Sequence, residues 1–205
     1  HTAFVALSRL ASGVYALRNP ERETLDAAVR TAAGLPGEFI GSPVGTTYYE
    51  VAGPDTGRVA LLVHGFSVPS YIWDSTFTSL AAAGYRAIAM DLRGYGGSDH
   101  PPHGYDPRTL SADVAGVIRS LGEEEAVIVG HGWGGLVAWS TAVLEPETVR
   151  AIAPVSMPHP RQLRRAILRN RHQRSAMNYA LGFQLPFVPE RSLSAHDAQR
   201  VVDLI

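Results

Sequence analysis

The stretch Gly130-His131-Gly132-Trp133-Gly134-Gly135 directly follows a short apolar run at residues 126–129 and precedes a helix-like segment at 133–144. Glycines at this density allow the backbone to turn sharply and to approach other groups closely. A buried strand that ends in such a turn and continues into a helix is typical of α/β proteins, in which ligands bind at the carboxyl ends of the strands. The stretch therefore indicates both the fold class and the place to look for a site.

Further apolar runs of the same kind occur elsewhere in the chain, and each is continuous rather than alternating. This pattern is expected of parallel strands that are buried on both faces. The runs lie at residues 59–63, 86–90 and 149–155. Helix-like segments at 73–83 and 108–121 separate them, so the alternation predicts βαβ units and a doubly wound, mostly parallel sheet. Ahead of these runs we expect two helices and one strand, at residues 3–18, 21–33 and 46–51.

Each of the buried strands ends in a turn that contains glycine or proline. These turns are His64-Gly65-Phe66, Asp91 to Asp99, the Gly130 stretch, and Met157-Pro158-His159-Pro160. Gly130, Gly132 and Gly135 also fit the G-x-G-x-x-G pattern of dinucleotide-binding proteins. We reject that interpretation because the dinucleotide pattern opens the first βαβ unit, whereas this one follows a late strand.

In order and spacing the four turns resemble those of the α/β-hydrolase fold, and most of all those of its epoxide hydrolase and haloalkane dehalogenase branch. The resemblance covers about residues 38–192. Residues 130–135 match the G-H-D-W-G-G elbow of that branch at five of six positions, and residues 179–186 resemble the start of its helical cap domain. It implies a hydrolase with a partial core at residues 38–157 and the start of a cap at residues 158–205. The helical segment expected at residues 1–37 lies outside the resemblance.

The resemblance also implies a set of site residues. The backbone N–H groups of Phe66 and Trp133 would form an oxyanion hole, and Tyr179 would donate a hydrogen bond from the cap or serve only in the core of the cap. For the side chains of His64 and His131 we prefer a structural role to one in proton transfer. The residues expected to line the substrate site are His64, Gly65, His131, Trp133, Pro158 and Phe183.

The nucleophile position departs from the family. The aspartate that stands there in relatives attacks an epoxide or halide carbon and forms an ester, which activated water then hydrolyses. Gly132 has no side-chain atom that can do this, and it also lacks the serine of the G-x-S-x-G esterases. We therefore expect no covalent hydrolysis from this chain. Because such an elbow costs a residue with a Cβ about 1–3 kcal/mol of strain, Gly132→Asp is expected to lower stability slightly.

The end of the sequence is a second departure. The chain ends at Ile205 in the cap-like region, whereas the family continues into two strands that carry an acid and a general-base histidine. His196 lies too early to be that base and is interpreted as a surface residue. The strand at 149–155 is then expected at an open sheet edge. Either further residues or a second chain, as in a homodimer, would complete the sheet.

Composition narrows the remaining classes of protein. The chain has 205 residues, is 45% hydrophobic and has a formal net charge of −1, which favours one globular domain over a disordered chain or a nucleic-acid or membrane-surface binder. It contains no cysteine, and all 18 of its basic residues are arginine. Disulfides, thiol catalysis, a P-loop lysine and Schiff-base chemistry are thereby excluded. We expect a cytoplasmic protein with no metal and no cofactor.

Two charged regions are given structural interpretations. The basic run at residues 159–174 is interpreted as the solvated face of an amphipathic helix rather than as a nucleic-acid patch. Asp91 and Asp99 flank a turn that contains Arg93, and we expect a structural salt bridge there rather than a second catalytic acid.

Two classes of function remain open. The first is an epoxide-hydrolase-like protein that acts on a small or medium apolar epoxide- or ester-like molecule. If it retains catalysis, it would use non-covalent acid–base chemistry such as ring opening or cyclisation. The second is a non-catalytic ligand-binding or interaction protein on a hydrolase scaffold, because a fold does not by itself imply a function.

Overall fold

The structure, a computed structural model, describes residues 37–42, 45–66 and 68–178. Its centre is a six-stranded sheet in the order β1-β2-β4-β3-β5-β6. The strands are β1 (Gly37–Ser42), β2 (Gly45–Ala52), β3 (Val59–Val63), β4 (Arg86–Met90), β5 (Ala126–His131) and β6 (Val149–Val155). The α-helices are α3 (Asp74–Ala82), α4 (Pro107–Ser120), α5 (Trp133–Leu144), α6 (Pro160–Arg169) and α7 (Arg171–Ala176). Two short 3-10 helices are η1 (Ser70–Trp73) and η2 (Pro146–Thr148).

The four strands predicted as buried apolar runs form the parallel part of the sheet. β3 pairs in parallel with β4 on one side and with β5 on the other, and β5 pairs in parallel with β6. β2 joins β4 antiparallel, and β1 joins β2 antiparallel. The doubly wound, mostly parallel sheet is thus confirmed. β1 was not predicted, because its six residues Gly-Glu-Phe-Ile-Gly-Ser include two glycines, which strands disfavour.

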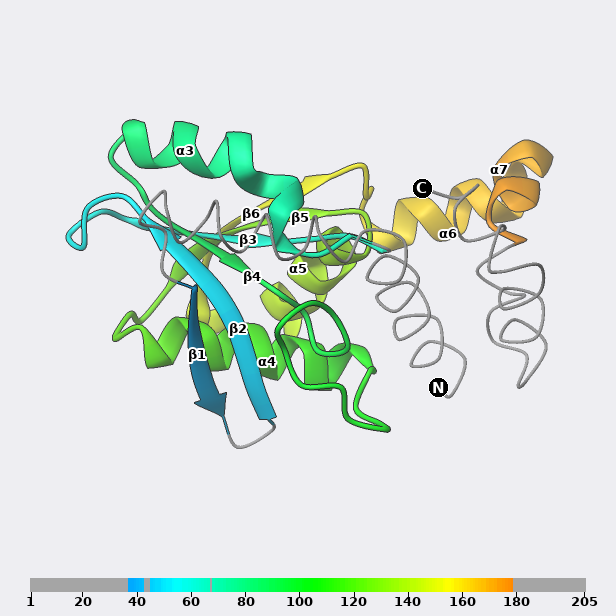
Figure 1. Ribbon diagram of the computed structural model, residues 1–205. Helices are drawn as coiled ribbons and strands as arrows, with labels where there is room; N and C mark the ends of the chain where they lie inside the picture. The colour runs from blue at the N-terminus through cyan, green and yellow to red at the C-terminus, as the bar shows by residue number, and fades with distance from the viewer. Residues whose placement is uncertain (1–36, 43–44, 67, 179–205) are drawn as a thin grey trace, which may run out of the picture.

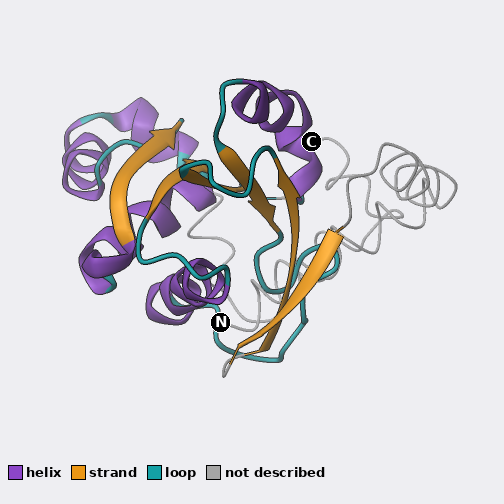
Figure 2. Ribbon diagram, turned by 90° about the vertical axis from the view of Figure 1, so that its left-hand side faces the viewer, coloured by secondary structure: helices purple, strands orange, loops and turns teal. Residues whose placement is uncertain are grey.

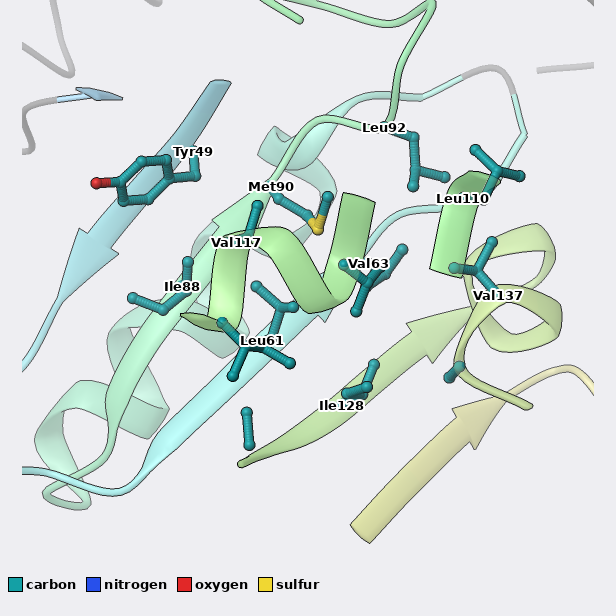
Figure 3. Close-up of a cluster of buried hydrophobic side chains, with 14 of the residues drawn as sticks. Tyr49, Leu61, Val63, Ile88, Met90, Leu92, Leu110, Val117, Ile128 and Val137 are labelled. Atoms are coloured by element: carbon teal, nitrogen blue, oxygen red, sulfur yellow. The ribbon is translucent and has the colours of Figure 1, made fainter. Parts of the chain in front are cut away.

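The sheet carries helices on both faces, as Figures 1 and 2 show, and each face has its own core cluster. On the face of α4 and α5, Leu61 and Val63 of β3 lie fully buried in the larger cluster (Figure 3). On the opposite face Leu62 packs with Phe77 of α3. Successive residues of β3 therefore serve opposite faces, which explains why the run is continuously apolar.

The start of α4 has a sequence-encoded cap. Asp106 precedes the helix, and its Oδ1 accepts hydrogen bonds from the backbone N–H groups of Arg108 and Thr109, each at 3.1 Å. Pro107 occupies the first helical position, where no N–H donor is required. The cap fixes where α4 begins, next to the turn that follows β4.

The region after β6 is more exposed than the core. β6 is the last strand of the sheet within the described residues, and Val155 at its end is 45% exposed. α6 projects from the core in Figure 1; its arginines at positions 161, 164, 165 and 169 are exposed, whereas Leu163 and Ile167 are half-buried. This agrees with the interpretation of a solvated helix face. The helices expected at 3–18 and 21–33 lie outside the described residues.

Candidate active site

The sharp turn predicted at Gly132 connects β5 to α5. Gly132 has φ 52° and ψ −115°, a conformation that residues with a Cβ rarely adopt. Its N–H donates to the carbonyl of Val155 at the end of β6, at 2.9 Å, and its own carbonyl accepts from the N–H of Leu136 at 3.1 Å. The turn is therefore held from both sides, by the neighbouring strand and by the first turn of the helix.

Three other glycines of the elbow are required by close packing. A Cβ on Gly134 would lie 2.2 Å from the carbonyl oxygen of Val63, and one on Gly130 would lie 2.2 Å from the carbonyl oxygen of Gly134. A Cβ on Gly135 would meet the Cβ of Met157 at 2.6 Å. α5 can thus approach β3 and the segment after β6 only because these side chains are absent.

Gly132 differs from these three glycines. Among the described residues, the only atom within 4 Å of a Cβ built on it, its chain neighbours aside, is the Cα of Gly65, at 3.9 Å. Position 132 therefore has room for a side chain, and a substitution there meets a backbone cost rather than a clash. The elbow thus has the backbone turn of a nucleophile elbow but lacks the side chain that would act as the nucleophile.

The turn after β3 lies beside the elbow. Val63 is paired with Gly130 in the sheet register, so Gly65 and Phe66 leave β3 next to the start of α5. Phe66 is half-buried, and Trp133 is the first residue of α5. The first N–H groups of a helix have no acceptor within the helix, which makes this end of α5 suited to a developing negative charge.

His64 is a structural residue. Its side chain is fully buried, its Nδ1 donates to the carbonyl of Gly65 at 2.8 Å, and its Nε2 accepts from the N–H of Leu92 at 2.9 Å. Burial lowers the pKa of His64, against an opposing effect of the nearby Asp91 carboxylate. The neutral ring therefore links the turns after β3 and β4. Because both ring nitrogens have partners inside the protein, this geometry favours the structural role, and a place for His64 in the substrate site stays a prediction.

Asp91 also links turns, but not through the salt bridge that we expected. Its Oδ1 accepts from the N–H of Ser70 at 2.7 Å, and its Oδ2 accepts from the N–H of Gly97 at 3.0 Å. Arg93 instead makes a two-pronged, buried ion pair with Asp113 of α4, in which Nε and Nη2 each donate over 2.5 Å. Burial raises the pKa of Asp113, and the Arg93 guanidinium opposes that shift.

Asp113 was missed by the sequence reasoning. It lies on α4 among the buried residues Val114 and Val117. A carboxylate placed on the apolar face of a helix is a signal that a buried cation faces it, since isolated charges are not buried. That signal was present in the sequence, in a segment assigned only as a helix.

His131 is half-buried and lies against Gly65. A Cβ on Gly65 would lie 2.9 Å from its Nδ1. This nitrogen is one of four buried side-chain polar atoms that have no hydrogen-bond partner in the described part of the chain. His131 is thus the titratable side chain that the sequence places next to Gly132 and that has an unused nitrogen.

The places of the remaining predicted residues relative to the elbow stay predictions. Pro158 is exposed, two residues before α6 begins. Tyr179, Phe183 and His196 lie outside the described residues. Within the described ranges no group of three metal-ligating side chains converges, and no helix is long and apolar enough to cross a membrane.

Comparison with known proteins gives a consistent result. Residues 60–203 match the alpha/beta hydrolase family. The chain is 36% identical over 166 residues to the AB hydrolase superfamily protein YfhM of Bacillus subtilis, covering 80% of this chain and 58% of that protein. It is 36% identical over 156 residues to epoxide hydrolase 4 of Mus musculus, covering 75% of this chain and 43% of that protein.

A solved structure shows the same likeness. The structure of epoxide hydrolase A from Mycobacterium thermoresistibile superimposes with a TM-score of 0.68 at 32% identity, covering 80% of this chain and 53% of that chain. The chain thus spans about half the length of the proteins that it matches.

Proposed function

The chain belongs to the α/β-hydrolase family, in its epoxide hydrolase-like branch, and we propose that it binds a small or medium apolar epoxide- or ester-like molecule at the Gly132 elbow without forming a covalent intermediate. The observation that carries the proposal is the elbow itself. Its backbone has the strained turn that presents a nucleophile, yet position 132 has no side chain and open space where one would stand.

The polar contacts proposed for the ligand come from the backbone. The N–H groups of Phe66 and Trp133 would form the oxyanion hole, in keeping with the position of Gly65-Phe66 beside the start of α5. Tyr179 is proposed as a further donor, and Pro158 and Phe183 as parts of the wall. We retain the division into residues 1–37, 38–157 and 158–205 as a proposal as well.

A second candidate is a non-covalent acid–base catalyst. The Nδ1 of His131 lies beside Gly65 and has no hydrogen-bond partner within residues 45–66 and 68–178, which favours this candidate because such a buried imidazole nitrogen can accept or donate a proton. In such a reaction water or an internal hydroxyl would open the ring while the epoxide oxygen takes up a proton.

The Gly132→Asp variant tests whether this place is a nucleophile position. The introduced carboxylate oxygen would attack an epoxide carbon of styrene oxide, the ring C–O bond would break, and the epoxide oxygen would take a proton from water. An ester then joins the ligand to the protein. Intact mass spectrometry should show a gain equal to the mass of one styrene oxide, or else diol formation if the ester is hydrolysed. The unsubstituted chain should show neither.

Gly122→Asp is the matched control. Gly122 also has a positive φ, of 80°, and a Cβ on it would meet nothing within 4 Å. It lies in the exposed turn between α4 and β5, away from the elbow. A mass gain in Gly132→Asp that is absent in Gly122→Asp supports the proposal. Equal labelling of both variants, or styrene diol produced by the unsubstituted chain, would contradict it, and diol that is lost in His131→Gln would favour the acid–base candidate.

A further inference from the structure

A cavity lies behind Trp133, on the face of the sheet that α4 and α5 cover. Its volume is about 140 Å³, and its walls come from the turn after β4, from the start of α4 and from the first half of α5. The wall residues that matter here are Leu92, Tyr95, Tyr105, Leu110, Trp133 and Val137. Figure 3 shows Leu92, Leu110 and Val137 together at one end of the buried cluster.

Three polar side chains at this cavity, those of Arg93, Tyr105 and Ser140, are already hydrogen-bonded within the protein. The guanidinium of Arg93 makes its two-pronged pair with Asp113. The hydroxyl of Ser140 donates to the carbonyl of Leu136 at 2.9 Å, and that of Tyr105 donates to the carbonyl of Pro101 at 2.8 Å. An anionic or strongly hydrogen-bonding ligand would have to break these bonds, so the cavity selects an uncharged apolar guest.

The size and lining of the cavity restrict the guest further. A dry apolar cavity of about 150 Å³ in another protein binds a benzene molecule. Three of the lining residues, Tyr95, Tyr105 and Trp133, are aromatic, and contacts between aromatic rings favour an aromatic guest over a linear alkane of the same volume. Leu110 and Val137 are 9% and 4% exposed, so a guest seated between them would be largely shielded from water.

We propose that this cavity is a binding site for one small uncharged aromatic ring, either as a free molecule or as the ring of a larger ligand. Trp133 joins it to the elbow, because the residue that lines the cavity directly follows Gly132. The inference needs no nucleophile and no turnover. The experiment on this cavity therefore tests the inference independently of the proposed function.

Fluorobenzene is the probe, and its ¹⁹F resonance reports binding. Titration of the chain should broaden and shift the resonance saturably, and an excess of benzene should reverse the effect. Val137→Phe should weaken binding at least tenfold, because the larger ring occupies the cavity itself. Val143→Phe is the matched control: the same substitution on the same helix, at a side chain that is 76% exposed, should leave binding within twofold.

Circular dichroism shows whether Val137→Phe folds. If it does not, Leu110→Phe replaces it, because this substitution fills the cavity from the opposite wall. Absence of saturable fluorobenzene binding by the unsubstituted chain would overturn the inference. So would equal binding by a folded cavity-filling variant and by Val143→Phe. None of these outcomes depends on whether an epoxide reacts at the elbow.

Discussion

His64 illustrates how a single buried side chain can make the stability of this protein depend on pH. In the folded chain its Nδ1 is a donor and its Nε2 an acceptor, so only the neutral ring satisfies both bonds. Burial also disfavours the charged ring and lowers its pKa from the ordinary value of 6.5. The unfolded chain has no such restriction and takes up the proton near pH 6.5.

The sign of the effect follows from which state binds the proton. Well above pH 6.5 the ring is neutral in both states and contributes no pH dependence. As the pH falls below 6.5 the unfolded state gains a proton that the folded state excludes, so the free energy of unfolding decreases. For one group the slope is at most about 1.4 kcal/mol per pH unit.

Urea unfolding between pH 7.5 and pH 5 measures this contribution when the chain is compared with His64→Gln. The glutamine cannot titrate, so its curve should be flatter over this range by up to that slope, although the variant is less stable at pH 7.5. The other histidines are common to both proteins and cancel in the comparison. Parallel curves for the two proteins would mean that the folded chain tolerates a charged His64.

The residues that sequence reasoning located correctly are those with a backbone signature. Gly132, Gly134 and Gly135 were recognised because glycine at these spacings implies a turn and a close approach, which local sequence encodes. The partner of Arg93 could not be found in this way. Asp113 lies twenty positions further along the chain and one element away, and it is joined to Arg93 only by the packing of α4 on the turn after β4.

At the scale of elements, the packing of α5 on β3 requires a glycine at position 134, whereas position 132 has room for a methyl group. Gly134→Ala places a methyl group 2.2 Å from a carbonyl oxygen of β3, which cannot move without breaking the sheet. Gly132→Ala meets no atom of the described part of the chain, apart from its neighbours, closer than 3.9 Å and bears only the cost of its backbone conformation. We expect about 1–2 kcal/mol of destabilisation from Gly132→Ala and clearly more from Gly134→Ala.

Equilibrium urea unfolding of the two alanine variants gives these values directly. Both substitutions replace glycine by alanine two residues apart, so they affect the unfolded chain similarly. Only Gly134 lies inside α5, where helix propensity favours alanine and so works against the expected order. If Gly132→Ala were the more damaging of the two, the open space at position 132 would not exist, and the Gly132→Asp experiment would lose its structural basis.

The elements themselves were largely predictable, and the exceptions have a physical reason. The strands at 59–63 and 86–90 match β3 and β4, because a strand buried on both faces must be apolar throughout. The apolar run at 149–155 matches β6, although the described structure leaves that strand largely exposed. β1 was not predicted because it lies at the edge of the sheet and pairs only with β2, so its residues need not be continuously apolar. The cap residues Tyr179 and Phe183 remain predictions.

At the scale of the whole molecule, β6 forms a sheet edge with which a strand of a partner chain could pair. Within the described residues no strand lies beyond it, and Ala151, Ala153 and Val155 are exposed along its length. An exposed apolar strand with unpaired backbone groups is a template for pairing with another strand. We therefore expect the 205-residue chain to self-associate through β6, in line with the homodimer considered from the sequence.

Sedimentation velocity over a range of micromolar concentrations tests this expectation with two lysine variants. Val155→Lys puts a charge on the strand edge and should shift the chain towards the monomer. Val143→Lys removes an apolar side chain that is even more exposed, 76% against 45%, but it lies on α5 and offers no backbone edge. If apolar surface alone drove association, Val143→Lys would have the larger effect.

Pairing of strand edges predicts that Val155→Lys dissociates the assembly while Val143→Lys leaves it intact. A monomer at every concentration would show that the β6 edge is protected without a partner.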